Sequence, residues 1–167
     1  MKILVVVDMQ NDFIDGSLGT AEAQAIVDNV VEKVKNFEGQ VVFTQDTHAD
    51  DYLQTQEGRR LPVKHCIEGT PGWEICDKLR PYVQFSWKKY GFGSAELAGM
   101  LGNFGPIESI ELVGLCTDIC VVSNALILKA FYREVPMIVD SSCCAGVTPE
   151  KHEAALEVMR SCQIEVV

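Results

Sequence analysis

Apolar and polar positions alternate along this chain in blocks that have either strand or helix character. Ile3–Val7 is a continuous apolar run, which is typical of a strand buried on both faces. Between Ala21 and Phe37, apolar residues recur with the i, i+3, i+4, i+7 spacing of an amphipathic helix, and Gly39 is suited to end it. A second strand, Val41–Thr44, follows directly.

The same alternation continues to the end of the chain after one interruption. Residues 45–72 are polar, contain several glycines and prolines and have no clear period, which is typical of a functional loop. The remaining elements that the pattern predicts are short segments at Trp73–Leu79 and Val83–Trp87, a helix near Ser94–Leu101, a strand at Ser109–Val113, a helix at Asp118–Tyr132, a strand at Val135–Val139, a helix at Pro149–Ser161 and a last strand at Gln163–Val167. Strands that alternate with helices indicate βαβ units around a parallel sheet. The sequence therefore predicts one α/β domain over residues 1–167.

Composition and net charge limit the classes of partner that this chain is expected to bind. The 167 residues include 24 acidic and 14 basic side chains, and the net charge of −10 disfavours nucleic acid and anionic membranes as partners. Seven cysteines cannot all pair, and their spacing resembles no secreted disulfide framework. The first apolar run is too short for a signal peptide, and no stretch approaches the ~20 apolar residues of a membrane span. We expect a soluble, cytoplasmic homo-oligomer that acts on a small molecule.

Polar residues that follow strands are candidates for a binding site, because ligands of open parallel sheets bind at the carboxyl ends of the strands. The side chains that follow four different predicted strands are Asp8, Asp46, His48, Lys89, Thr117, Asp118 and Cys120. We expect these groups to converge on one rim of the sheet.

Three of these residues have the chemistry of a cysteine nucleophile. A thiol attacks a carbonyl carbon as the thiolate, and a free pKa of ~8.5 leaves only a small fraction ionised at neutral pH. Asp8 can accept the proton of Cys120. The ammonium of Lys89 and the N-terminal end of the following helix favour the thiolate, so we expect a lowered pKa for Cys120. A packing role for this cysteine is the alternative.

Asp46, His48 and His65 form a second group. Two histidines and a carboxylate suit Zn²⁺, Fe²⁺ or Mn²⁺ and leave positions open for water or substrate. The Asp-x-His spacing places its two ligands on one side of an extended segment. A pair of solvated loop histidines is the alternative interpretation.

Other polar residues and cysteines have structural interpretations. We expect His152 on the exposed face of the last helix, without a special role. Cys143 and Cys144 follow a predicted strand end and are interpreted as packing residues. Asp12 and Asp118 are interpreted as turn and helix-start residues.

Five segments, in this order along the chain, resemble the motifs of the isochorismatase-like cysteine hydrolases. Asp8–Phe13, Lys89–Ser94 and Gly114–Val121 resemble the three family motifs, whereas Asp46–His48 and Pro62–Thr70 resemble the metal motif of the nicotinamidase branch. The resemblance covers nearly the whole chain. It implies a doubly wound, mostly parallel six-stranded sheet with helices on both faces.

The resemblance also implies a Cys-Asp-Lys triad. Asp8 would be the general base, Lys89 the electrostatic partner and Cys120 the nucleophile. A cis peptide would join Leu115 to Cys116, and the backbone N–H groups of Cys116 and Cys120 would form an oxyanion hole.

A divalent ion is implied as well, with Asp46, His48 and His65 as its ligands. Zinc is the first expectation, and iron or manganese would also suit these ligands. The implied reaction is hydrolysis of a small carboxamide through a thioester, with nicotinamide as the substrate in NAD salvage. The alternatives are an N-carbamoyl or ureido amide hydrolase of the same family and a catalytically silent metal-binding protein.

Two departures from the family pattern concern the substrate pocket. Close nicotinamidases often have Trp-Pro shortly before the second metal histidine, where this chain has Leu61-Pro62. An aromatic residue that would stack on a pyridine ring is therefore missing or is supplied by Trp73 or Phe92. Phe13 either stacks on the substrate or packs in its loop. The lysine motif also ends in Phe-Gly-Ser, where the family often has Tyr-Ser-Ala-Phe.

Overall fold

The computed structural model describes all residues from Met1 to Val167 and contains one six-stranded, fully parallel sheet. Its strands are β1 (Lys2–Val7), β2 (Gln40–Asp46), β3 (Ser86–Lys89), β4 (Ser109–Leu115), β5 (Met137–Ala145) and β6 (Glu165–Val166). Its α-helices are α1 (Asn11–Ile14), α2 (Ala21–Ala25), α3 (Val27–Asn36), α4 (Gln56–Arg60), α5 (Ala95–Leu101), α6 (Val122–Phe131) and α7 (Pro149–Ser161). None of the helices combines the length and the apolar character that crossing a bilayer requires. The predicted α/β class is confirmed.

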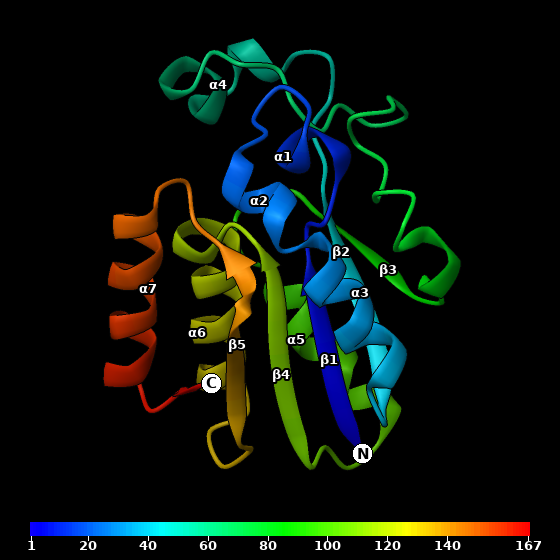
Figure 1. Cartoon of the computed structure of the whole chain (residues 1–167), viewed down its shortest axis with the longest axis vertical. Coiled ribbons are helices and arrows are strands. Elements are labelled where there is room, and N and C mark those ends of the chain that lie inside the picture. Colours follow the sequence, from blue (N-terminus) through cyan, green and yellow to red (C-terminus); the bar gives the residue numbers. More distant parts are fainter.

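Helices cover both faces of the sheet (Figure 1). On β1, the side chains of Leu4 and Val6 belong to the core under α2 and α3. Ile3, Val5 and Val7 belong to the core under α5, α6 and α7. The unbroken apolar run of the first strand therefore reflects burial on both faces.

The strand order β3-β2-β1-β4-β5-β6 changes direction between β1 and β4. This pair is the topological switch point, where open parallel sheets bind their ligands. The two backbones approach closely there, since Gly114 has a φ of +116° and a Cβ atom on it would lie 2.1 Å from the carbonyl oxygen of Val7. Only glycine fits this position. The loops that follow β1 and β4 therefore begin next to each other.

Two predicted helices are interrupted in the structure. Residues 21–37 form α2 and α3, which are separated at Ile26, and the prediction of one continuous helix is wrong. Because Ile26 and Val27 are both buried, the apolar pattern continues through the interruption and does not reveal it. Residues 118–132 likewise do not form one α-helix, because a π-helical turn, η4 (Thr117–Val121), precedes α6.

Two strand ends also differ from the prediction. Lys89 is the last residue of β3 rather than a residue that follows the strand. β5 extends to Ala145 although residues 140–142 are polar, because a register shift against β4 lets the strand continue past them. Cys143 and Cys144 therefore lie inside β5, where they pack into the cores on opposite faces of the sheet.

One lysine ties the helical layer to two central strands. Lys33 on α3 places its Nζ 2.8 Å from Glu111 Oε1 on β4 and 2.6 Å from Asp140 Oδ2 on β5. Burial alone would raise the pKa of Asp140, but hydrogen bonds from Lys33 and Ser142 outweigh it and lower this pKa. A carboxyl group with a lowered pKa stabilises the fold above its unfolded pKa of ~3.9, and this contribution is lost as the pH falls through the folded pKa.

We expect Lys33→Met to lower the free energy of unfolding by about 1–3 kcal/mol at pH 7, because two hydrogen bonds to carboxylates are lost. The difference from wild type should shrink below pH ~4, where those carboxyl groups become protonated. Urea denaturation at several pH values measures both effects. Lys35→Met is the control, since Lys35 is exposed and pairs only with Glu32 of its own helix. A difference that stays constant from pH 7 to pH 3 would contradict this account.

Candidate active site

Four chain segments at the carboxyl ends of β1 to β4 meet at the switch point, as the sequence predicts. Asp8 follows β1, Asp46 ends β2, Lys89 ends β3 and Cys120 lies in η4 after β4. All four residues are buried, and Asp8 is completely inaccessible to solvent. Their side chains form one continuous cluster around the Lys89 ammonium.

The ammonium of Lys89 contacts each of the other three side chains. Its Nζ atom lies 2.7 Å from Asp8 Oδ2, 3.0 Å from Asp46 Oδ1 and 3.4 Å from Cys120 Sγ. It also donates a hydrogen bond of 3.0 Å to the carbonyl oxygen of Gly91. The proposed triad residues are therefore in direct contact, and the ammonium is held from three strand ends.

Asp8 is held by β2 and keeps one oxygen for chemistry. Thr44 Oγ1 donates to Asp8 Oδ1 at 2.6 Å and accepts from the backbone N–H of Asp8 at 3.2 Å. The other oxygen, Oδ2, lies 2.7 Å from Lys89 Nζ as a buried ion pair. The same ammonium also contacts Asp46, Gly91 and Cys120, so Oδ2 shares it with three other groups. Asp8 Oδ2 is therefore a buried acceptor available for a proton.

The surroundings of Cys120 favour the neutral thiol over the thiolate. Complete burial raises its pKa well above the ordinary cysteine value, the charges of Asp8 and Asp46 raise it further, and Lys89 opposes them only in part. Burial also raises the pKa of Asp8. The expectation of a lowered thiol pKa is therefore wrong, although the charge of Lys89 acts in the expected direction. Two carboxylates already outnumber the one ammonium, and a thiolate would add a second uncompensated negative charge.

The three predicted metal ligands come together on the other side of Asp46. One ligand atom each from Asp46, His48 and His65 can be chosen so that all lie within 4.8 Å of one another. His65 Nδ1 donates to the carbonyl oxygen of Val63 at 2.8 Å, which leaves Nε2 as the ligand atom. His48 Nε2 lies 2.8 Å from Asp46 Oδ2, so both histidines face the same carboxylate. This donor set fits a divalent transition-metal ion.

Glu57 is a further candidate ligand that the sequence analysis missed. Its Oε1 lies 3.7 Å from His48 Nε2 and 3.5 Å from His65 Nε2. Glu57 belongs to α4, in the polar segment where no element was predicted. The only indication of Glu57 in the sequence is that it is an acidic residue in the same loop region as both histidines. With Glu57 the group has four potential protein ligands.

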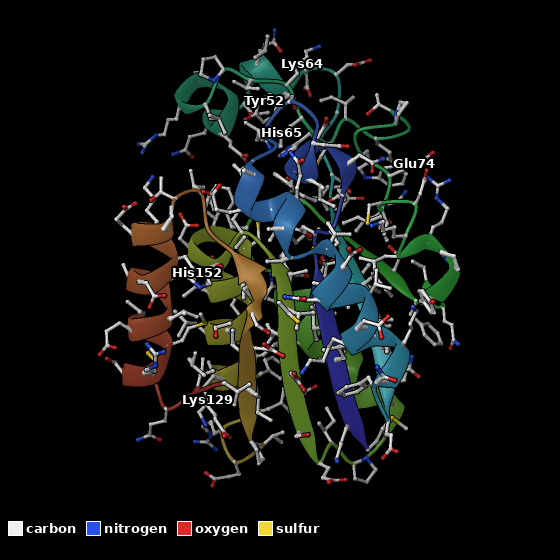
Figure 2. The ribbon with its side chains drawn as sticks, in the orientation of Figure 1. Tyr52, Lys64, His65, Glu74, Lys129 and His152 are labelled. Carbon is white, nitrogen blue, oxygen red and sulfur yellow. The ribbon has the colours of Figure 1, made fainter.

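Neighbouring residues fix the metal group in place. Gln10 is fully buried and makes two hydrogen bonds with the backbone of Asp46: its Oε1 accepts from the N–H and its Nε2 donates to the carbonyl oxygen. The ring of Tyr52 packs against both histidines, with ring centroids 4.7 and 4.9 Å away. Figure 2 shows Tyr52 and His65 close together beside the α4 segment. The ligand atoms are therefore held from two sides before any ion binds.

A cavity of about 290 Å³ opens beside both groups. Its lining includes Asp46, His65 and Glu57 at the metal side and Cys116 and Cys120 at the thiol side. This volume is close to the lower limit of small-molecule sites, which begin at ~300 Å³. A larger hollow of about 740 Å³ lies beside α3 and contains none of the residues of the candidate site.

The aromatic candidates separate into two groups. Phe13 and Phe92 line the cavity together with Leu61, as the sequence analysis predicts for the two phenylalanines. Trp73 does not line it: its Nε1 donates to Thr47 Oγ1 at 3.0 Å, and the ammonium of Lys88 lies over its ring. The prediction of Trp73 as a substrate-stacking residue is therefore not supported. Its indole is used to hold the loop after β2.

The loop after β4 has the predicted backbone form. The peptide bond between Leu115 and Cys116 is cis. The carbonyl oxygen of Cys116 accepts from the N–H groups of Ile119 and Val121, which wraps the η4 turn around it. Cys116 and Cys120 both line the cavity. Their amides are thus in the region where an oxyanion hole would have to lie.

Comparisons with known proteins identify the family of this chain. The isochorismatase domain profile matches residues 2–167, and the chain belongs to this family. The nicotinamidase/pyrazinamidase of Mycobacterium tuberculosis is 29% identical over 187 residues, which span 100% of this chain and 98% of that protein. The crystal structure of the pyrazinamidase of Pyrococcus horikoshii in complex with zinc has a TM-score of 0.82 and 29% identity, and the match covers 99% of this chain and 98% of that one.

A third similar protein is named for an N-carbamoyl substrate rather than for nicotinamide or pyrazinamide. The crystal structure of N-carbamoylsarcosine amidase from Thermoplasma acidophilum has a TM-score of 0.79 and 29% identity, and the match covers 99% of this chain and 94% of that one. The predicted resemblance to the isochorismatase-like family and its nicotinamidase branch is confirmed.

The charge state of Cys120 is open to a direct test. We expect iodoacetamide to modify Cys120 slowly at pH 7 and faster only at alkaline pH, because the raised pKa limits the thiolate. Asp8→Asn should accelerate the modification, since it removes a charge that disfavours the thiolate, and Lys89→Met should slow it. Peptide-resolved mass spectrometry follows each cysteine, with the exposed Cys162 as an internal reference. Modification of Cys120 that equals or exceeds that of Cys162 at pH 6–7 would refute this description.

Proposed function

We propose that this chain is a metal-dependent cysteine amidohydrolase that converts a small carboxamide, in the first place nicotinamide, to its acid and ammonia. The observation that carries the proposal is the contact of Cys120, Asp8 and Lys89 at 2.7 to 3.4 Å beside the Asp46 metal group and one shared cavity. The relative named nicotinamidase/pyrazinamidase supports the choice of substrate.

The first half of the reaction forms a thioester. Cys120 Sγ gives its proton to Asp8 Oδ2 and attacks the amide carbon. The amide oxygen gains negative charge, which the backbone N–H groups of Cys116 and Cys120 stabilise. Asp8 then returns the proton to the amide nitrogen, the C–N bond breaks and ammonia leaves.

The second half regenerates the thiol. Asp8 removes a proton from a water molecule, which attacks the thioester carbon, and the C–S bond breaks. Cys120 recovers a proton as the acid product leaves. Lys89 stays protonated throughout, because burial alone would lower its pKa but its anionic neighbours outweigh burial and raise it above the ordinary value. Its role is to keep the negative charges of the cluster compensated.

We propose zinc as the resident metal, held by Asp46, His48, His65 and Glu57, with iron or manganese as ions that these ligands would also accept. A metal ion at this place supplies a Lewis acid for a lone pair of the substrate, such as a ring nitrogen. Asp46 contacts both this group and Lys89, so the metal group and the nucleophile act on one substrate molecule.

The metal ligands lead to a prediction that does not depend on activity. We expect Glu57→Gln to weaken zinc binding tenfold or more and His48→Ala to abolish stable binding, because each removes a ligand atom. Competition with a chromophoric zinc chelator measures both affinities. Glu74→Gln is the control, since Glu74 is exposed and pairs with Arg80. Equal affinities of wild type and Glu57→Gln would reduce the site to three protein ligands.

The nucleophile is tested by a pair of cysteine variants. We expect Cys120→Ala to lower kcat by at least ~10³-fold while the affinity for the acid product is kept, because only the attacking atom is lost. Cys116→Ala should retain most of the activity, since only its backbone is proposed to act. Ammonia release is measured with nicotinamide, pyrazinamide, N-carbamoyl amino acids and ureidoacrylate. Retention of more than a few per cent of kcat in Cys120→Ala would disprove the role of the thiol.

The same substrate panel decides between the two enzyme hypotheses. Leu61 lies in the cavity lining where close nicotinamidases often have tryptophan, and a solved amidase of similar fold is named for an N-carbamoyl substrate. Higher kcat/KM for an N-carbamoyl or ureido compound than for nicotinamide would favour that alternative. Both outcomes keep the same nucleophile.

A further inference from the structure

The sequence predicts that His152 is exposed and has no special role, and the structure contradicts the predicted exposure. It lies on the second turn of α7, half-buried, and Figure 2 shows it in the space between α7 and α6. Its Nδ1 lies 2.8 Å from the hydroxyl of Thr117. No local sequence pattern indicates this contact, since the two residues are 35 positions apart.

Thr117 occupies a sensitive position in the candidate site. It directly follows Cys116 and is the first residue of the η4 turn that carries Cys120. Its side chain is completely buried and does not line the cavity, so it has no direct part in binding. Its hydroxyl has one hydrogen-bond partner in the structure, the imidazole of His152.

A second contact joins the same turn to the loop before α7. Asp118 Oδ1 accepts from the backbone N–H of Val147 at 2.9 Å. Gly146 makes this close approach possible, because a Cβ atom there would lie 2.8 Å from the backbone nitrogen of His152 and 3.0 Å from Asp118 Oδ1. The β5–α7 loop thus packs directly on the turn.

We propose that His152 is a positioning residue: through Thr117 it holds the Cys116–Cys120 turn in the geometry that stabilises the transition state. This inference rests on the function proposed above. This single π-helical turn has few backbone hydrogen bonds of its own, and the side chains of Thr117 and Asp118 tie it to His152 and to the backbone of Val147. The imidazole contact is also separate from the integrity of α7, because the helix uses the backbone N–H of His152, which donates to Thr148.

The expected size of the effect follows from how sharply catalysis depends on geometry. Loss of one oxyanion donor costs about 10²–10³-fold in kcat, and a displacement of the reacting groups by ~1 Å costs about 10²-fold. A turn that loses one of its side-chain supports keeps its donors but holds them less firmly. We therefore expect His152→Ala to lower kcat by about 10–100-fold.

The experiment compares five variants with wild type. His152→Ala removes the imidazole, Thr117→Val removes the hydroxyl without changing the shape, and His152→Asn keeps a polar atom close to the place of Nδ1. Both removals should lower kcat with KM changed less than about twofold, and the double variant should be no worse than either alone. His152→Asn should recover most of the loss. Glu153→Ala, on the exposed side of α7, is the control and should match wild type.

A second readout separates positioning from general structural support. Pyridine-3-carbaldehyde adds the Cys120 thiol across its C=O bond, and the resulting thiohemiacetal oxygen occupies the place of the transition-state oxygen. Its affinity should fall in His152→Ala by the same factor as kcat, whereas nicotinate affinity, zinc content and Tm should stay as in wild type. Parallel losses of Tm, nicotinate affinity and aldehyde affinity would overturn the proposal, and so would wild-type kcat in His152→Ala.

The outcomes also distinguish this inference from the proposed function. Absence of ammonia release from every amide in wild type would refute the function, yet the aldehyde affinities of wild type and His152→Ala would still test the positioning role. Equal aldehyde affinities in the two proteins would refute the positioning role while hydrolysis by wild type leaves the function intact. Absence of both hydrolysis and aldehyde adduct in wild type would overturn both.

Discussion

The buried ammonium of Lys89 is the constraint on which the candidate site depends. A positive charge that is 2% exposed is costly unless anionic groups surround it, and removal of a partner from such a group typically costs about 3–5 kcal/mol. Here the compensation comes from Asp8 and Asp46, at 2.7 and 3.0 Å, and the sulfur of Cys120 completes the contacts. Because these groups stand at the ends of four neighbouring strands, the fold and the chemistry are held together by the same charge.

The sheet explains why so few residues suffice. Parallel strands bring their carboxyl ends to one edge, and the reversal of strand order between β1 and β4 leaves room there for a cavity. Gly114 lets the two strands approach closely at this point. The side chains at the ends of β1–β3 then contact Cys120 on the η4 turn after β4, beside the cavity. The fold itself therefore supplies the alignment that a cysteine hydrolase needs.

The sequence predicts the features that local patterns determine, but not those that depend on contacts between distant segments of the chain. The strand ends identified Asp8, Asp46, Lys89 and Cys120 as neighbours, because chain order and sheet type determine where strand ends meet. The charge state of Cys120 was predicted wrongly, since burial and a second carboxylate, both tertiary features, outweigh the ammonium. Glu57 and His152 reach the site from the helices α4 and α7, and hydrophobic periodicity does not determine how these helices pack against the site. The position of Trp73 also depends on tertiary contacts, so its prediction as a cavity residue is not supported.

Asp46 gives the site a property that bears on how such proteins diverge. One of its oxygens holds the Lys89 ammonium and the other faces both metal-group histidines, so a single carboxylate belongs to two sites at once. Burial alone would raise the pKa of Asp46, but His48 and Lys89 outweigh it and lower this pKa. A descendant that abandoned metal binding could replace the histidines freely, yet it would have to retain an acidic residue at this position to keep the lysine buried. The carboxylate would then remain in a protein that no longer binds a metal ion at this position.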